Sequence, residues 1–123
     1  MSRFDKYGGV TGGFRAKLAA AVILADVGVI KGASINSSGL VVQGASALGT
    51  YRGLICADVV FAAGQAIDVM TNGEIVEVPT FTAGQAIYVD VATGLLTATA
   101  GSNQYVGHMV ELGRLVVRLS RTT

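Results

Sequence analysis

The sequence predicts a small all-β protein: a single-domain β-barrel or β-sandwich, built from short hairpins and preceded by an extended N-terminal arm. Three observations support this fold class. The 123 residues include 17 glycines and only one proline, and the glycines divide the chain into short apolar segments. Several of these segments alternate apolar and polar residues, as half-buried strands do. A nine-residue motif that leads into such a segment also occurs twice.

The length of the chain fits a single domain, and its composition indicates that this domain contacts another protein. Hydrophobic residues make up 51% of the chain and charged residues 14%, whereas an ordinary soluble domain has about 25% charged residues. We therefore expect part of the apolar surface to contact another protein. The longest apolar run, 18–30, contains Gly28 and is shorter than the roughly 18 to 20 residues of a membrane helix. We expect no membrane span and no secretory signal, and synthesis in a cytoplasm.

The first residues predict an arm. Residues 1–13 contain two glycine pairs among aromatic and basic residues, and they keep no regular hydrophobic period. We therefore predict an extended arm over 1–13 and one β domain over 14–123. Such an arm can add to the edge of a partner's sheet, with main-chain hydrogen bonds and aromatic anchors. The candidate partner-binding residues are Arg3, Phe4, Tyr7, Phe14, Arg15 and Lys17.

Residues 14–25 allow two interpretations. Alanines favour a helix, and Phe14, Leu18 and Val22 have the i, i+4 spacing of one helical face. The β-branched residues from Val22 onward favour a strand. We prefer a strand over most of this segment, and the helix remains open.

Turn residues place several of the following strands. Residues 36–39, Asn-Ser-Ser-Gly, predict a turn before the apolar run 40–42. Near the C-terminus, 105–111 predicts a strand, Leu112-Gly113 a turn, and 114–119 a final strand. Apolar and charged residues alternate in that last segment, so one of its faces is expected to be buried.

The repeated motif is the clearest feature of the chain. Residues 61–69 (FAAGQAIDV) and 81–89 (FTAGQAIYV) differ at two of nine positions. The glycine of each copy is predicted to supply a tight bend, and the glutamine either a hydrogen bond in the turn or an exposed side chain. Each copy is predicted to lead into a hairpin. The predicted turns are Asn72-Gly73 and Ala92-Thr93-Gly94, with return strands over 75–78 and 95–99.

Charges are segregated along the chain. Residues 1–52 hold six basic and two acidic residues, 53–113 hold six acidic and no basic residues, and 114–123 hold three basic residues. Two interpretations fit this pattern. The basic ends could meet acidic surfaces on neighbouring copies or on a larger shell, or they could fold back across the acidic middle of the same chain.

Few side chains are available for catalysis. Cys56 and His108 are the only cysteine and histidine. A zinc site needs further ligands of these types, and a catalytic triad built on the histidine has no supporting motif, so we expect neither. We expect Cys56 to be a small buried residue and His108 to be exposed at a strand edge or an interface. The carboxylates expected to face solvent are Asp68, Glu74, Glu77 and Asp90. We predict no catalytic residue, no metal and no cofactor, and therefore no enzyme.

Nucleic-acid binding is the main polar alternative. Basic and aromatic residues are interleaved over residues 3–17, a pattern that suits binding of single-stranded nucleic acid. The net charge is only +1, and the acidic middle would repel phosphate. We do not expect a nucleic-acid partner, but a single-stranded nucleic-acid-binding β domain remains an alternative.

The second half of the chain resembles a known family. In the capsid decoration (cement) proteins of tailed bacteriophages, an aromatic-x-Asp or Trp-Asp pair precedes a glycine turn and alternating threonines. A Val-Gly strand and a final Val-x-Val-Arg-Leu strand then follow. Tyr88-Val89-Asp90 stands here where Trp-Asp is common, and the chain has no tryptophan. The similar segments are 83–90, Gly94, 96–99, 106–110 and 116–119.

The resemblance implies a β-tulip-like domain, commonly a homotrimer, on the outer surface of an expanded capsid that it stabilises. It implies the major capsid protein and further copies of the chain as partners, with the N-terminal arm ordered against the capsid protein. The protein would be made in the host bacterial cytoplasm and located in the virion. Another phage structural β module, such as a tail or adaptor component, is the alternative within the same class.

Overall fold

The protein is almost entirely β, as the sequence predicts. The computed structural model describes residues 2–4, 12–44 and 51–119. In these residues, one short 3-10 helix, η1 (Leu24–Asp26), accompanies ten strands. The strands are β1 (Arg3–Phe4), β2 (Gly12–Lys17), β3 (Ile30–Ile35), β4 (Val41–Gln43), β5 (Gly53–Cys56), β6 (Ala66–Val76), β7 (Ala86–Val89), β8 (Leu96–Thr97), β9 (Gln104–Glu111) and β10 (Arg114–Arg118).

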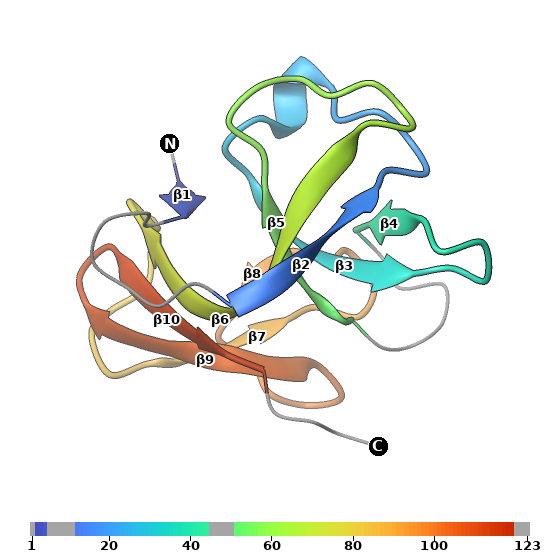
Figure 1. The fold of residues 1–123 in the computed structure, drawn as a ribbon. Coiled ribbons are helices and arrows are strands. Elements are labelled where there is room, and N and C mark those ends of the chain that lie inside the picture. The colour runs from blue at the N-terminus through green and yellow to red at the C-terminus, as the bar shows by residue number, and fades with distance from the viewer. Residues whose placement is uncertain (1, 5–11, 45–50, 120–123) are drawn as a thin grey trace.

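The strands form one sheet that curls on itself (Figure 1). Its order is β4-β3-β5-β6-β10-β9-β7-β8, with β1 and β2 paired to β6 as well. A bridge between Lys31 and Leu95 brings the β8 end back to β3. A second bridge, between Leu18 and Val41, brings the end of β2 to β4. The sheet therefore closes twice, and both closed parts share β3, β5 and β6.

Each closed part holds its own hydrophobic core. Leu54 and Met70 belong to the first core, while their neighbours Ile55 and Val69 belong to the second, so β5 and β6 bury side chains on both faces. The buried members of the first core are Ile30, Tyr51, Leu54, Met70, Ile75, Val78, Ile87, Val89, Val106, Met109, Leu115 and Val117. Those of the second are Leu18, Val22, Ala33, Val41, Ile55, Ala57, Ile67 and Val69.

The sequence repeat is also a structural repeat. In the first copy, the Gly64 amide donates to the Leu18 carbonyl (2.8 Å), and the Leu18 amide donates to the Gln65 carbonyl (2.9 Å). In the second copy, the Gly84 amide donates to the Met109 carbonyl (2.7 Å), and the Met109 amide donates to the Gln85 carbonyl (2.9 Å). Leu18 at the end of β2 therefore corresponds to Met109 on β9.

The glycine and glutamine of each copy have the same local role. Gly64 and Gly84 adopt φ of 87° and 83°, a left-handed conformation that glycine adopts readily. The Gln65 side-chain oxygen accepts a hydrogen bond from the Ala62 amide, as that of Gln85 does from its own turn. The predicted tight bends are confirmed, and of the two roles left open for the glutamines the structure shows the turn hydrogen bond.

The predicted hairpin turn at Asn72-Gly73 is wrong, because β6 continues through both residues to Val76. Asn72 pairs with Gly12 on one side and Arg118 on the other, so strand partners are available where a turn would end the ladder. The register shifts here, since Gly13 pairs with Met70 and Gly12 with Asn72. Such a bulge bends a strand instead of reversing it.

The chain turns only after β6, around Glu77 and Thr80, which have positive φ of 58° and 77°. Neither residue is glycine, but Pro79, the one proline of the chain, lies between them and is a turn residue that the predicted hairpin did not use. The Val78 amide between them donates to the Gly113 carbonyl (2.9 Å), which ties this turn to the one between β9 and β10.

Several other predictions agree with the structure. The turn at 36–39 forms, with the Asn36 side-chain oxygen accepting from the amides of Ser38 and Leu40. The turns at 92–94 and 112–113 also form. The strand preferred over most of 14–25 forms only over 14–17, as part of β2; Leu18 and Val22 then make isolated bridges, and helical structure is limited to η1. Because β2 begins at Gly12, it crosses the predicted boundary between arm and domain, and that division stays a prediction.

Candidate functional site

The predicted partner-binding residues lie on two short strands that both pair with β6. β1 pairs with the C-terminal end of β6, and β2 pairs with its N-terminal half (Figure 1). The two ends of this long strand therefore each receive part of the predicted set. Its described members are Arg3 and Phe4 on β1 and Phe14, Arg15 and Lys17 on β2, whereas Tyr7 lies outside the described residues.

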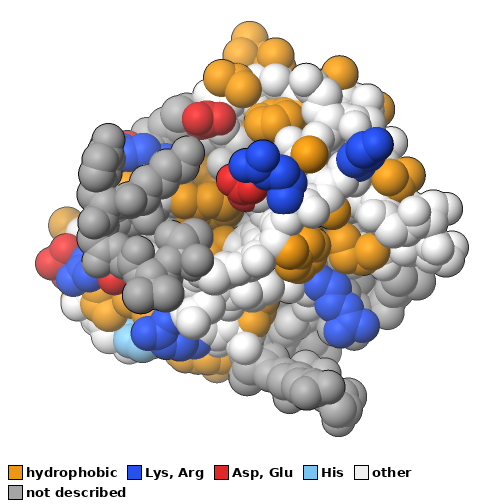
Figure 2. Space-filling model, in the orientation of Figure 1, with side chains coloured by type: hydrophobic (Ala, Val, Ile, Leu, Met, Phe, Trp, Pro, Cys, Tyr) orange, Lys and Arg blue, Asp and Glu red, His pale blue; other side chains and the backbone are white. Residues whose placement is uncertain are grey.

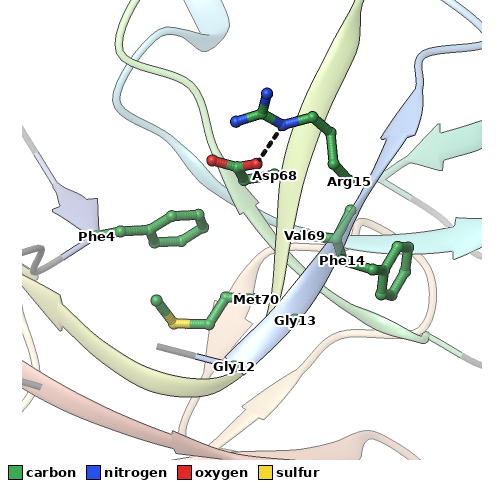
Figure 3. Close-up of a pocket in the computed structure, with 8 residues that line it drawn as sticks. All are labelled: Phe4, Gly12, Gly13, Phe14, Arg15, Asp68, Val69 and Met70. Carbon is green, nitrogen blue, oxygen red and sulfur yellow. Dashed lines mark hydrogen bonds and ion pairs between the residues drawn. The ribbon is translucent and has the colours of Figure 1, made fainter. Parts of the chain in front are cut away.

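A pocket of about 320 Å³ lies between β1, β2 and β6. Phe4 and Met70 lie on one side of β2, where Arg15 and Asp68 approach each other, and the Phe14 ring lies on its other side (Figure 3). The pocket therefore has apolar walls and one charged pair. This combination suits a bound peptide segment, with an apolar side chain against the walls and its polar backbone near the charged pair. The lining residues are Phe4, Gly12, Gly13, Phe14, Arg15, Asp68, Val69 and Met70.

Two of the predicted cations already have partners within the chain. The Arg3 guanidinium lies 2.8 Å from a Glu77 carboxylate oxygen and lowers the pKa of that carboxyl. Arg15 Nε donates to an Asp68 oxygen at 2.8 Å, which raises the pKa of Arg15. Of the two interpretations of the charge pattern, these contacts follow the second, with a basic end folded back on the acidic middle. Lys17 is exposed and forms no ion pair with any residue that the structure describes.

The four carboxylates do not all face solvent freely. Asp68 and Glu77 are exposed, as predicted. Glu74 is half-buried beside Arg114, which also binds Glu111, and the two carboxylates raise the pKa of Arg114. Asp90 is half-buried too, and its side chain accepts hydrogen bonds from two amides of the following turn. The prediction of solvent-facing positions is therefore wrong for Glu74 and Asp90, which hold strands and a turn in place.

Cys56 and His108 lie on strands that are not neighbours in the sheet, β5 and β9. The Cys56 thiol donates to the Ser2 carbonyl at 3.0 Å, and burial raises its pKa to about 11. His108 is half-buried on an interior strand, paired with Ala86 on one side and Val116 on the other. Its predicted position at a strand edge is wrong. No group of three or more metal-ligating side chains occurs within 2–4, 12–44 and 51–119.

The structure also reveals an exposed apolar surface that the sequence interpretation missed. Ile23 and Leu24 are 58% and 79% exposed, and Val59 and Val60 are 56% and 55% exposed. Hydrogen bonds between Val22 and Phe61 (2.9 and 3.2 Å) place the two segments side by side. Figure 2 shows hydrophobic side chains at this end of the molecule, where Figure 1 draws η1. We call these four residues the apolar tip.

A signal for the apolar tip was present in the sequence. Val22-Ile23-Leu24 and Val59-Val60-Phe61 are each three consecutive large apolar residues. Successive residues of a strand point to opposite faces, so a strand with one buried face cannot bury all three. Val22 is buried and Phe61 half-buried against the second core, and the remaining four side chains project outward.

Comparisons with known proteins identify the fold. No protein-family model matches the sequence, and no curated protein matches it. Among solved structures, a chain from Mycobacterium phage Patience is similar, with a TM-score of 0.82 and 18% sequence identity. The match covers 98% of this chain and 97% of that one. The two proteins therefore share one all-β fold over nearly their whole lengths.

The described part of the chain contains no helix that is long and apolar enough to cross a membrane.

Proposed function

We propose that this chain is a structural protein of a tailed-phage virion, which binds the outer capsid surface as a decoration subunit and stabilises the expanded shell. The observation that carries the proposal is the fold match to a mycobacteriophage chain, which covers 98% of this chain and 97% of that one. The resemblance of segments 83–90, 96–99, 106–110 and 116–119 to decoration proteins supports it from an independent direction. The major capsid protein and other copies of the chain, in a homotrimer, are the proposed partners.

The apolar tip is the surface best suited to this role. Its four large side chains are each more than half exposed, although 20 hydrophobic residues are buried in the described part of the chain. Contiguous exposed apolar side chains mark interaction sites in soluble proteins. A subunit that binds at many equivalent positions of a shell needs only modest affinity at each contact, because linked copies bind together.

The test is sedimentation of the purified protein with expanded empty capsids of its own phage. We expect Ile23→Ser/Leu24→Ser to raise the dissociation constant at least about tenfold, which corresponds to about 1.4 kcal/mol of lost binding free energy. Both side chains are exposed, so the variant should fold normally. Leu112→Ser is the matched control, because Leu112 is 81% exposed but lies in the turn between β9 and β10.

Two results would count against the proposal. If the wild-type protein does not sediment with expanded shells, decoration is wrong. If the tip variant and Leu112→Ser bind equally well, the shell contact lies elsewhere on the surface. A variant that binds shells normally but loses its oligomeric state would assign the apolar tip to contacts between copies.

A further inference from the structure

Among the residues that the structure describes, no strand pairs with the edge of β2 that faces away from β6, and we call this the open edge. Along residues 12–16, the structure describes no strand on that side, and the only bridge on it joins Leu18 to Val41 at the far end. β2 also lies at the front of the molecule in the view of Figure 1, where no described strand covers it. Open strand edges present unpaired main-chain groups that can bind another strand.

The hydrogen-bond pattern shows which amides face this edge. The Leu18 amide donates to Gln65 beyond the end of β6. Bonded and non-bonded residues alternate along an antiparallel pair, so the amides of Ala16 and Phe14 also face β6. The Arg15 amide and carbonyl then point to the open side.

The structural repeat supplies the counterpart of this edge. Lys17 pairs with Ala66 in the first copy as His108 pairs with Ala86 in the second, so β2 corresponds to β9. On β9 the corresponding edge is occupied, because β10 runs antiparallel along it and pairs with His108 through Val116. The place that β10 fills beside β9 is the place that is open beside β2.

We propose that the open edge of β2 accepts an antiparallel extended strand from the capsid shell, in the position that β10 occupies beside β9. This inference rests on the proposed function and adds to it the secondary structure of the contact. The added strand would lie beside β2 and run in the opposite direction, passing Ala16 first, then Arg15, and ending near Gly12. Its main chain would bond the Arg15 amide and carbonyl, in the manner of strand addition to a sheet.

Charge favours a shell segment over a second copy of β2. Arg15 and Lys17 lie two residues apart, so their side chains share one face of the strand. Asp68 pairs with Arg15, whereas Lys17 has no ion-pair partner among the described residues. Two copies of β2 paired edge to edge would bring each Lys17 close to the basic residues of the other copy, and like charges opposite one another destabilise a strand pair. A neutral or acidic segment meets no such repulsion.

Hydrogen–deuterium exchange of the full protein, free and bound to expanded empty capsids, tests the proposal. In the free protein, the Arg15 amide should exchange rapidly, while the amides of Phe14 and Ala16 are protected. On shells, the Arg15 amide should slow by about a hundredfold or more, as expected for an amide that gains a stable hydrogen bond. Protection of Arg15 in the free protein would show that the edge is already covered and would overturn the proposal.

A pair of variants isolates the main-chain contact. Arg15→Pro removes the outward amide, and Arg15→Gln removes the same ion pair with Asp68 but keeps the amide. We expect Arg15→Pro to bind shells at least about tenfold more weakly than Arg15→Gln, since it loses the main-chain bond that a shell strand would make. Ala16→Pro should instead unfold at lower denaturant concentration, because its amide faces β6.

The outcomes separate this inference from the proposed function. Binding to shells without protection of the Arg15 amide, or equal binding by the two Arg15 variants, overturns the strand addition and leaves decoration intact. Absence of wild-type binding overturns both. If Arg15→Gln sediments as an oligomer in solution and Arg15→Pro as a monomer, the occupant is a second copy and the shell strand is wrong. If Arg15→Pro does not fold, the exchange measurement on the wild-type protein decides.

Discussion

At the scale of single residues, the molecule joins its basic ends to its acidic middle. Arg3 contacts Glu77, Arg15 contacts Asp68, and Arg114 contacts both Glu74 and Glu111. An exposed ion pair contributes only about 0 to 1 kcal/mol. The pairs therefore matter mainly for position. Those with Glu77, Asp68 and Glu74 join β6 or the segment directly after it to a neighbouring strand, and the Arg114–Glu111 pair joins β10 to β9.

The Arg3–Glu77 pair predicts a pH dependence. The pKa of Glu77 in the folded protein lies below its ordinary value of 4.5, with the hydrogen bond from Arg3 as the largest cause. Its contribution to stability is therefore present above pH 4.5 and is lost as the pH falls through the folded-state pKa. Arg3→Gln should be less stable than the wild type at pH 7 and differ less at pH 3, measured by urea unfolding. A difference that does not change with pH would contradict this account.

The reaction rate of the Cys56 thiol is expected to report how firmly the N-terminal strand is held. Its pKa of about 11 leaves very little thiolate at pH 7.5, and its thiol donates to Ser2, next to β1. The native protein should react with a disulfide reagent far more slowly than the urea-unfolded protein, in which the thiol has an ordinary pKa. Arg3→Gln should react faster than wild type, because β1 is held less firmly. Rapid reaction of the native wild-type thiol would disprove this.

At the scale of elements, β6 is the strand on which the two cores depend. Val69 faces the second core, while Met70 and Ile75 face the first. Val69 and Ile75 are six residues apart and would share a face in a regular strand. The register shift opposite Gly12 and Gly13 changes the alternation, so that one strand serves both cores.

The two copies of the repeat offer a matched pair of substitutions. Ile67 and Ile87 occupy the same motif position and are 5% and 0% exposed, in the second and first core respectively. Either isoleucine replaced by alanine should cost about 2 to 5 kcal/mol of unfolding free energy. Because β5 and β6 belong to both cores, each variant should still unfold in a single transition by fluorescence and circular dichroism. Two separate transitions would show that the cores are independent.

The sequence predicts those elements whose cause is local. The left-handed glycines at 64 and 84, the Asn36 turn and the alternation of the last strand all follow from residue type and spacing. Asn72-Gly73 fails because strands distant in sequence pair with it on both sides, which no local pattern reveals. The same reason hides the two cores. Apolar residues on both faces of β5 indicate burial but not which partners bury them.

The candidate site was likewise predictable from the sequence only in part. The sequence picks out Phe4, Phe14 and Arg15, and the structure brings these three to one pocket. It does not predict that the Arg15 charge is already paired within the chain, because Asp68 is 53 residues away. The apolar tip depends on two segments meeting at the Val22–Phe61 bridge, and only the folded chain brings them together.

At the scale of the whole molecule, the composition and the surface agree. A chain with 51% hydrophobic and 14% charged residues builds two cores and still exposes an apolar tip. The basic ends are partly neutralised within the chain, which weakens a purely electrostatic mode of binding. On this account, apolar contact at the tip and strand addition at β2 together hold the subunit on a shell, repeated over many symmetric positions.

The most direct test of the central claim is a cryo-electron-microscopy map of expanded capsids mixed with the purified protein. The account predicts added density on the outer surface at symmetric positions, into which the fold fits with the apolar tip against the shell. Density inside the shell, density confined to the tail, or shells identical to undecorated controls would contradict it.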